Sequence, residues 1–458
     1  MRNVFPTLHR RAIDDMSVFT TPNADGLHIG EIDGIELYPD RAEVLPYGAV
    51  YLQGGPHLQY MSDHHRYLRA FGLGAKELRF VEGSGNLFDG ILSDPEHRDR
   101  LYRELFFDLD ATLETFTGAS PGWGRLLAEL QIPSERIRTA PWDVAKTLHD
   151  KEGFRRLSRQ IGRSDVFPAH TFSHGIQGTI WDCLRLRLRH PRIVVKRPDL
   201  ESGVGFHVLH DTRSWAGLLP FLRKYAQGSR NLIVERWIDG EEKAVGSVQW
   251  YVPPPGKKPQ RRFLSRQYCD GTIHQGNMIP HDEADAFPAT WDYSTRQAIT
   301  QTAWHTTETF VRDAQERGYV GHIGFDFITA LNSDGLSFQF FLLEANARKT
   351  AGTYPESVRW QVQQFGHTLK PCVAMRNCHP HSGIDHWEKA VSLLGSESDR
   401  DGFGDLAMNR EHRGVLVLNP RLLRKQGHPK CIVMSVASTP EEAERLMNAA
   451  AARLEAGC

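Results

Sequence analysis

Two acids and an amide stand out in one stretch of the chain, GHIGFDFITALNSDGLSFQFFLLEANARKTAGTYP. Residues 323–327 alternate between large apolar side chains and small or acidic ones, which is the period of a β-strand. The letters NSDG that follow are typical of a turn, and a second apolar run comes after them. The stretch therefore predicts an antiparallel hairpin with Asp326 on its first strand and with Glu344 and Asn346 at the end of its second.

Two carboxylates side by side in an apolar hairpin are costly to bury unless a positive group lies between them. Mg²⁺ binds one or two carboxylates, a side-chain carbonyl and phosphate oxygens, and Asp326, Glu344 and Asn346 supply the protein part of that set. The sequence therefore predicts a divalent-cation site. The alternative is a surface hairpin whose acids face water.

A lysine followed by a glycine-rich loop forms a second group of interest. The letters RIVVK predict a strand that ends at Lys196, and the loop after it contains Ser202, Gly203 and Gly205. A lysine places a point charge on phosphate groups, and glycines let backbone N–H groups approach them closely. The pattern predicts a phosphate-binding loop.

The order strand, Asp, strand, Glu-x-Asn resembles the metal-binding core of the ATP-grasp superfamily, which includes D-alanine–D-alanine ligase and biotin carboxylase. The resemblance implies that Asp326, Glu344 and Asn346 hold two Mg²⁺ ions, for which Mn²⁺ can substitute, against the phosphates of ATP. It also implies that Lys196 and the glycine loop bind the α- and β-phosphates, with Lys196 taking part in catalysis.

The same resemblance assigns a role to a lysine at the start of a helix. Residues 143–161 have apolar positions at helical spacing, and Gly162 is a fitting helix end. Lys151, after Asp150, matches the lysine that reaches the nucleotide phosphates in ATP-grasp enzymes. Lys146 could take that role instead, and a solvated helix face is the alternative for both lysines.

A further strand resembles the hinge that holds the adenosine of ATP. In the letters NLIVERWIDG, the resemblance implies that the Glu235 side chain and the backbone of Arg236, Trp237 and Ile238 bind the adenine edge. Glu242, after the glycine turn, matches the position whose carboxylate holds the ribose hydroxyls. The alternative is an edge strand with ordinary surface charge.

Arg348, two residues after Asn346, is similar to the arginine of biotin carboxylase and of the pheganomycin-type peptide ligases. The resemblance implies a catalytic role, in which a planar guanidinium holds the carboxylate substrate and the later oxyanion. In D-alanine–D-alanine ligase an arginine lies two residues before the first metal acid, where this chain has Gly324. The alternative is an arginine that only fixes the end of the hairpin.

The surrounding elements predict an α/β (α+β) protein with the ATP-grasp fold. Short buried strands at 47–53 and 78–82, separated by loops, suit a small α/β domain with a parallel sheet. We expect a preATP-grasp α/β domain over 1–140, the ATP-grasp domain over 141–375 and a small C-terminal α/β domain of peptide-ligase type over 376–458. The tripartite pattern most resembles the pheganomycin-type peptide ligases.

Charge is balanced, with 55 basic and 56 acidic residues, which argues against general electrostatic binding to nucleic acid or membranes. The first residues, MRNVFPTLHRRAIDD, lack the apolar core of a secretory signal, and no apolar run is long enough to span a bilayer. The six cysteines are scattered, and the cysteines and histidines of residues 372–386 lack the spacing of structural zinc sites. We expect a cytoplasmic protein with small-molecule partners only; a homodimer is compatible with the sequence.

The function that these patterns predict is ATP-dependent ligation of a carboxylate to an amine through an acyl phosphate, with ADP and phosphate as products. The substrates would be amino acids or peptides, as in specialised peptide biosynthesis. Three alternatives stay open: an alcohol or thiol acceptor, a kinase that releases the phosphorylated carboxylate, and a nucleotide-binding regulator without catalysis.

Overall fold

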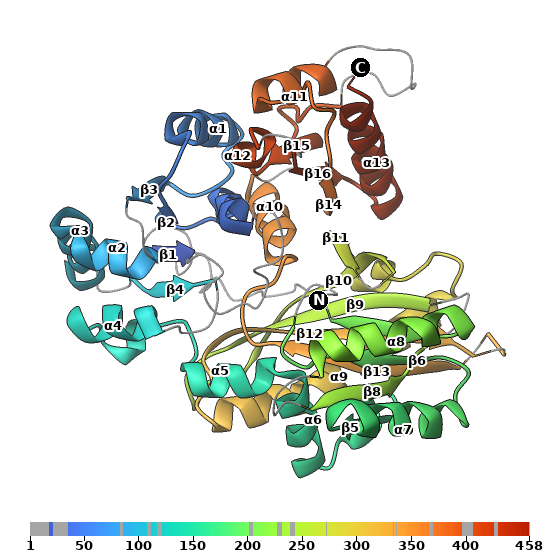
Figure 1. The fold of residues 1–458 in the computed structure, drawn as a ribbon. Helices are drawn as coiled ribbons and strands as arrows, with labels where there is room; N and C mark the ends of the chain where they lie inside the picture. Colours follow the sequence, from blue (N-terminus) through green and yellow to red (C-terminus); the bar gives the residue numbers. More distant parts are fainter. Residues whose placement is uncertain are drawn as a thin grey trace, which may run out of the picture.

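The computed structural model describes residues 18–21, 35–82, 86–107, 111–116, 121–200, 205–226, 231–238, 243–271, 273–332, 334–335, 337–365, 370–395, 406–425 and 429–457. Its strands form three sheets, two of four strands and one of eight. Figure 1 shows the first sheet between its helices, with α1 on one side and α2, α3 and α4 on the other, and the C-terminal elements next to it.

The first sheet is parallel, with the strand order β3-β2-β1-β4. The short strands and the parallel pairing confirm the α/β pattern expected for this region. Its elements are β1 (Val18–Thr21), η2 (Ile35–Val44), β2 (Ala49–Gln53), α1 (Leu58–Ala70), β3 (Glu77–Val81), α2 (Leu87–Ser93), α3 (Pro95–Phe107), β4 (Leu113–Thr115), α4 (Pro121–Glu129) and η3 (Ser134–Arg136).

The second sheet is antiparallel, with the order β5-β8-β6-β7. Its elements are β5 (His170–Ser173), α7 (Gly175–Arg187), β6 (Ile193–Lys196), β7 (Phe206–Leu209), α8 (Thr212–Tyr225) and β8 (Leu232–Arg236). Val195 and Val234 belong to the apolar cluster that both helices share. Because side chains alternate along a strand, Lys196 and Glu235, each one residue further on, lie on the opposite face.

The third sheet has the order β13-β12-β9-β10-β11-β14-β16-β15, and all its pairs are antiparallel. Its strands are β9 (Lys243–Val252), β10 (Gln260–Asp270), β11 (Ile273–Ile279), β12 (Gly321–Leu331), β13 (Phe338–Asn346), β14 (Cys372–Cys378), β15 (Gly414–Leu418) and β16 (Cys431–Ala437). The expected boundary at residue 375 lies within β14, which pairs with β11 and β16. The division into domains stays a prediction.

Helices flank this sheet and connect it to the other two (Figure 1). They are η4 (Ser164–Val166), η5 (Glu283–Ala286), α9 (Tyr293–Glu316), α10 (Thr353–Gln364), α11 (Trp387–Leu394), α12 (Pro420–Leu423) and α13 (Pro440–Ala456). Ile323, Phe325 and Phe327 of β12 are fully buried in the apolar cluster that includes α9. The intervening residues of β12, among them Asp326, therefore face the other side of the sheet.

The segment 143–161 forms two helices where the sequence pattern suggested one continuous apolar face. They are α5 (Trp142–His149) and α6 (Lys151–Gln160). Asp150 separates them because its side chain accepts a hydrogen bond from the Gly153 N–H and so caps the second helix. Gly162 has φ of 72°, as expected for the residue that ends a helix.

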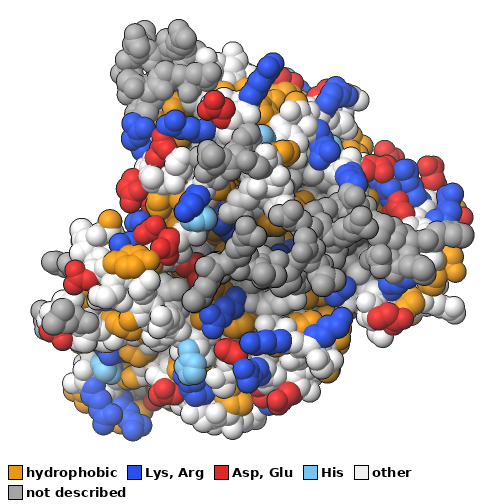
Figure 2. All heavy atoms as spheres, turned by 180° about the vertical axis from the view of Figure 1, so that it is seen from behind, with side chains coloured by type: hydrophobic (Ala, Val, Ile, Leu, Met, Phe, Trp, Pro, Cys, Tyr) orange, Lys and Arg blue, Asp and Glu red, His pale blue; other side chains and the backbone are white. Residues whose placement is uncertain are grey.

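Basic and acidic side chains are interspersed on the face that Figure 2 shows, in agreement with the balanced composition. Within the described part of the chain, no helix has both the length and the apolar character needed to cross a membrane.

Candidate active site

The predicted hairpin brings its two acids together. Asp326 of β12 pairs directly with Glu344 of β13, and Gly324 pairs with Asn346. The register shifts just after Asp326, because Phe327 pairs with Leu342 and leaves an extra residue on β13. Such a bulge changes the direction of the side chains next to it. The three predicted metal ligands therefore lie together at one end of the hairpin.

Asp326 is held by amide groups. Its Oδ1 accepts a hydrogen bond from Gln267 Nε2 at 3.0 Å, and its Oδ2 accepts one from Asn346 Nδ2 at 3.1 Å. Burial and, after it, the neighbouring Glu344 carboxylate raise the pKa of Asp326 to about 7, against the opposing effect of a hydrogen bond with Ser247. The carboxyl is therefore poised to ionise when a cation binds beside it.

Lys151 connects this hairpin to the predicted phosphate loop. Its Nζ lies 2.8 Å from Glu344 Oε2 and donates a hydrogen bond to the Leu200 carbonyl at 2.8 Å. Lys146, the other candidate from the sequence, is exposed on α5 with its Nζ 5.9 Å from the centre of the Trp142 ring. Of the two lysines, Lys151 is the one that lies beside the predicted metal acids.

Lys196 and Glu235 form a buried triad with Arg155. One carboxylate oxygen of Glu235 accepts from Lys196 Nζ and the other from Arg155 Nη2. Burial opposes ionisation of Glu235, but Arg155 and Lys196 outweigh it and hold its pKa below the usual value. Burial, assisted by the charge of Arg155, lowers the pKa of Lys196. The Glu235 carboxylate thus fixes Lys196, and its predicted contact with adenine stays a prediction.

The hinge residues after Glu235 are engaged with their surroundings. The Arg236 N–H donates to the Ala169 carbonyl at 2.8 Å, and the Trp237 N–H donates to the Arg192 carbonyl at 3.1 Å. Ile238 is buried in a small apolar cluster with strand β12. An adenine edge bound at this hinge would therefore have to use other backbone groups.

The glycine loop is described only in part. Gly205 has φ of 74°, and its carbonyl accepts a hydrogen bond from the Arg197 N–H at 3.0 Å. A Cβ on Gly205 would lie 2.6 Å from Leu200 Cδ1, so a larger residue does not fit there. Ser202, Gly203 and Glu242 lie outside the described residues, and their predicted roles stay predictions.

Arg348 lies at the end of the hairpin, close to the acids. Its N–H donates to the Asn346 carbonyl at 2.7 Å, and its Nη1 donates to the Lys349 carbonyl at 3.0 Å. Its charge also acts on Asp326, where it lowers the pKa against the larger effect of burial. The guanidinium is thus near the predicted metal site, as the sequence indicated.

Sequence reasoning missed a second ion pair beside Arg348. Lys349 Nζ lies 3.0 Å from Glu114 Oε1, and Tyr47 Oη donates to Glu114 Oε2 at 2.6 Å. The Lys349 N–H also donates to the Phe116 carbonyl at 3.2 Å. These contacts fix the residue after Arg348 to the end of β4 in the first sheet. The short segment around Glu114 carries no motif that could have revealed them.

A row of buried polar side chains on the same face of the large sheet was also missed. Ser247, Gln249, Ser265 and Asn277 are each at most 2% exposed. Polar residues at alternate positions of the letters GSVQW are the signal that could have predicted this face. Asn277 lies in β11, and its Nδ2 forms a hydrogen bond with the His274 ring of the same strand.

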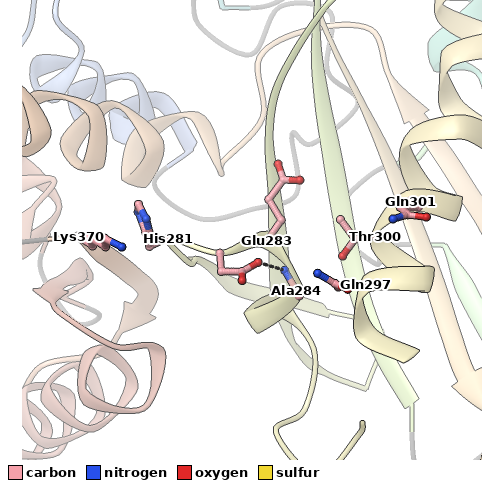
Figure 3. A pocket seen from close by; sticks show the side chains of 8 residues that line it. His281, Glu283, Ala284, Gln297, Thr300, Gln301 and Lys370 are labelled. Carbon is pink, nitrogen blue, oxygen red and sulfur yellow. Dashed lines mark hydrogen bonds between the residues drawn. The ribbon is translucent and has the colours of Figure 1, made fainter. Parts of the chain in front are cut away.

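Figure 3 shows a separate open pocket of about 500 Å³, formed by residues around η5, by α9 and by Lys370. Its two acids have partners: Asp282 accepts from the Ala284 N–H and Tyr293 Oη, and Glu283 accepts from Trp304 Nε1. None of the predicted site residues lines this pocket.

Neither a protein-family model nor a curated protein matches the sequence, whereas solved structures share its fold. N5-carboxyaminoimidazole synthetase from Staphylococcus aureus in complex with ADP superposes with a TM-score of 0.53 at 13% identity, covering 96% of this chain and 97% of that one. The synthase from Aspergillus clavatus, in complex with ADP and 5-aminoimidazole ribonucleotide, gives 0.52 at 14% identity, covering 95% and 98%.

Biotin carboxylase from Campylobacter jejuni, in complex with an ATP analogue, gives a TM-score of 0.52 at 11% identity, covering 95% of this chain and 90% of that one. These neighbours are ATP-grasp proteins. Likeness at such low identity concerns the fold, and it establishes that this chain has the α/β ATP-grasp fold. What the chain does must be argued from its own site.

Proposed function

We propose that this protein is an ATP-dependent carboxylate–amine ligase, and that its substrates are amino acids or peptides, as in the pheganomycin-type ligases. The observation that carries the proposal is the half-buried Asp326–Glu344 pair, which Lys151 joins to the loop after β6. Two facing acids, a lysine that contacts one of them and a second lysine on the opposite sheet form a set suited to a metal-bound nucleotide.

The donor set fits Mg²⁺ and ATP. Asp326, Glu344 and Asn346 offer oxygen ligands of the kind Mg²⁺ prefers, and a bound cation would favour the ionised form of Asp326, whose pKa burial and Glu344 raise. Lys151 and Lys196 would pair with the phosphates, and the hinge after Glu235 would hold the adenine. When bound, Mg·ATP supplies the phosphoryl group that converts a carboxylate into a good electrophile.

The remaining steps would rest on residues of the chain. The substrate carboxylate oxygen attacks the γ-phosphorus, which breaks the bond to ADP and gives an acyl phosphate. The amine then forms a bond to the acyl carbon, loses a proton and displaces inorganic phosphate. Arg348 is the group placed to hold the carboxylate and then the oxyanion, because its fork pairs two oxygens and keeps its charge throughout. The first sheet and the C-terminal strands would close around the substrates and exclude water.

The experiment that tests the proposal is a measurement of ADP release from Mg·ATP with mixtures of amino acids and short peptides, with mass spectrometry of the products. We expect release that requires both a carboxylate and an amine, and a product with a new amide bond. Release that needs only a carboxylate would indicate a kinase, and an ester or thioester would indicate another acceptor. Nucleotide binding without any release would favour the regulator and overturn the proposal.

A further inference from the structure

Arg262 is the extra residue of a β-bulge in β10. Arg261 pairs with Trp250 of β9 and Phe263 pairs with the adjacent Gln249, so Arg262 has no partner of its own in the ladder. Bulges occur frequently next to active sites, where they redirect a side chain. The irregularity therefore calls for a functional explanation at Arg262.

The bulge places neighbouring residues on opposite faces of the sheet. Arg261 lies over the rings of Trp250 and Trp304, on the face covered by α9. Phe263 lies on the other face, since a Cβ on Gly352 would be 2.9 Å from its ring. In a regular strand, residues two apart share a face. Here they do not, and the inserted residue lies between them.

Arg262 acts on the face that carries the candidate active site. Its positive charge lowers the pKa values of Tyr47, His322 and Lys349, although burial dominates the shifts of all three. These residues come from three separate segments: the loop before β2, strand β12 and the residues just after β13. The guanidinium therefore acts on the region where Tyr47, Glu114 and Lys349 meet.

The region around Glu114 has more positive than negative charge, with Lys349 and Arg262 against one carboxylate. Glu114 is already engaged by Lys349 and Tyr47, at 3.0 and 2.6 Å. Burial, with help from Lys349 and Arg262, lowers the pKa of His322 well below its usual value, so its ring is neutral. Among the residues that the structure describes, Arg262 has neither a hydrogen bond nor an ion pair. One half-buried guanidinium is therefore left to bind an anion.

The position of Arg262 determines the length of a ligand that could contact both Arg262 and the metal acids. His322, on which its charge acts, lies four residues before Asp326 on the same strand, a separation of about 13 Å at 3.3–3.4 Å per residue. Lys349 contacts Glu114, and Arg348 Nη1 donates to the Lys349 carbonyl. A ligand that reaches from the metal acids to Arg262 is thus as long as an amino acid joined to an amino acid or a short peptide.

We propose that Arg262 is a specificity-determining residue that binds a free carboxylate at the far end of the substrate, about 13 Å from the metal acids. The inference rests on the proposed ligase function and adds a substrate class to it. The carboxylate has two sources: the α-carboxylate of an amino acid or peptide acceptor, or a second carboxylate of the donor. A planar guanidinium suits either source because it can pair two oxygens at once.

The kinetic test compares Arg262→Gln with Arg261→Gln, a matched control on the other face of the same strand. With the substrate pair that gives most ADP release, we expect Arg262→Gln to raise KM for the carboxylate-bearing partner by about 10- to 100-fold, as loss of a charged hydrogen bond does. ATP affinity and kcat at saturation should stay within a few-fold, and Arg262→Lys should recover part of KM. Equal KM values in Arg262→Gln and Arg261→Gln would overturn the inference.

Capped substrates separate the two sources. An acceptor with its carboxylate converted to an amide should give the same KM in wild type and Arg262→Gln if the acceptor supplies the anion. If the difference in KM between wild type and Arg262→Gln persists, converting the second carboxylate of the donor to an amide should remove it. A difference that survives both caps would overturn the inference.

A binding measurement keeps this inference distinct from the proposed function. If no mixture gives ADP release, the ligase proposal fails, and saturation-transfer NMR with a mixture of amino acids and dipeptides still tests Arg262. We expect signals of carboxylate-bearing compounds that weaken in Arg262→Gln and persist in Arg261→Gln. Equal signals in wild type and Arg262→Gln, including none in either, would overturn the inference.

Discussion

The candidate active site contains two carboxylate clusters that differ in their charged contacts. In the hairpin cluster, the two half-buried carboxylates of Asp326 and Glu344 pair across the strands, and Lys151 contacts Glu344. In the hinge cluster, the single carboxylate of Glu235 contacts both Lys196 and Arg155. The pKa values follow the same division, because that of Asp326 is raised and that of Glu235 is lowered.

The difference indicates what each cluster can bind. A deficit of positive charge is corrected by a divalent cation, which the hairpin oxygens are suited to coordinate. An excess of positive charge is neutralised by an anion such as a phosphate group. The two clusters lie on different sheets, and Lys151 contacts both the hairpin and the loop that leads from the hinge sheet. Together they would form complementary halves of the proposed site for a metal-bound nucleotide.

The largest expected effect comes from removing one hairpin acid. We expect Asp326→Asn or Glu344→Gln to lower turnover at saturating Mg²⁺ by about 10³-fold or more, because losing a metal ligand removes several kcal/mol of transition-state stabilisation. Circular dichroism should show an intact fold. Near-normal rates of ADP release in both variants would show that the hairpin is not the metal site and that the comparison is wrong.

Arg348 lies beside the hairpin acids without serving as a metal ligand. Its substitution therefore separates the loss of a nearby positive charge from the loss of the metal. We expect Arg348→Ala to slow coupling by about 10²-fold, by analogy with loss of one oxyanion donor, and to change ATP affinity only a few-fold. Arg348→Lys should recover part of the rate, since a point charge cannot pair two oxygens. If Arg348→Ala lowers thermal stability and ATP binding as much as coupling, the arginine only fixes the hairpin end.

Lys196 tests the hinge cluster. We expect Lys196→Ala to weaken ATP binding about 10-fold, measured by calorimetry, because one charged contact to phosphate is lost. Lys146→Ala is the matched control, since Lys146 is an exposed lysine on α5. Equal ATP affinities in the two variants would mean that Lys196 serves only to neutralise Glu235.

The smallest effect concerns stability in the absence of metal. A carboxyl whose pKa is higher in the folded than in the unfolded chain takes up a proton on folding, so its contribution to stability is lost as pH rises. For Asp326, with a folded pKa of about 7, the metal-free protein should lose stability as pH rises from about 4 to 7.

Asp326→Asn should reduce the loss of stability that accompanies rising pH. At pH 8 the variant should unfold at a higher temperature than wild type, while remaining inactive. The measurement is thermal unfolding in a chelating buffer at several pH values. A variant that is less stable than wild type at pH 8 would assign Asp326 a mainly structural role.

The sequence predicted the hairpin well because its information is local. The alternation around Asp326, the turn letters and the apolar run before Glu344 specify the two strands and their approximate register. The structure confirms the strands, the pairing of the acids and the ATP-grasp fold.

Contacts between distant segments could not be predicted in this way. The pairing of Lys349 with Glu114 joins residues more than two hundred positions apart, and neither belongs to a recognisable motif. The helix break at Asp150 was missed because a side-chain cap competed with an apolar periodicity that continues across it. The Arg262 bulge depends on how β9 and β10 pair, which composition does not reveal.

We propose that the hairpin acids hold divalent cations together with ATP, and the other predictions depend on this binding. The most direct test is electron paramagnetic resonance of Mn²⁺ titrated into wild type and Asp326→Asn with a non-hydrolysable ATP analogue present. We expect wild type to bind about two Mn²⁺ ions per chain with the nucleotide, and Asp326→Asn to lose at least one of them. Equal Mn²⁺ binding by wild type and Asp326→Asn would contradict the proposal.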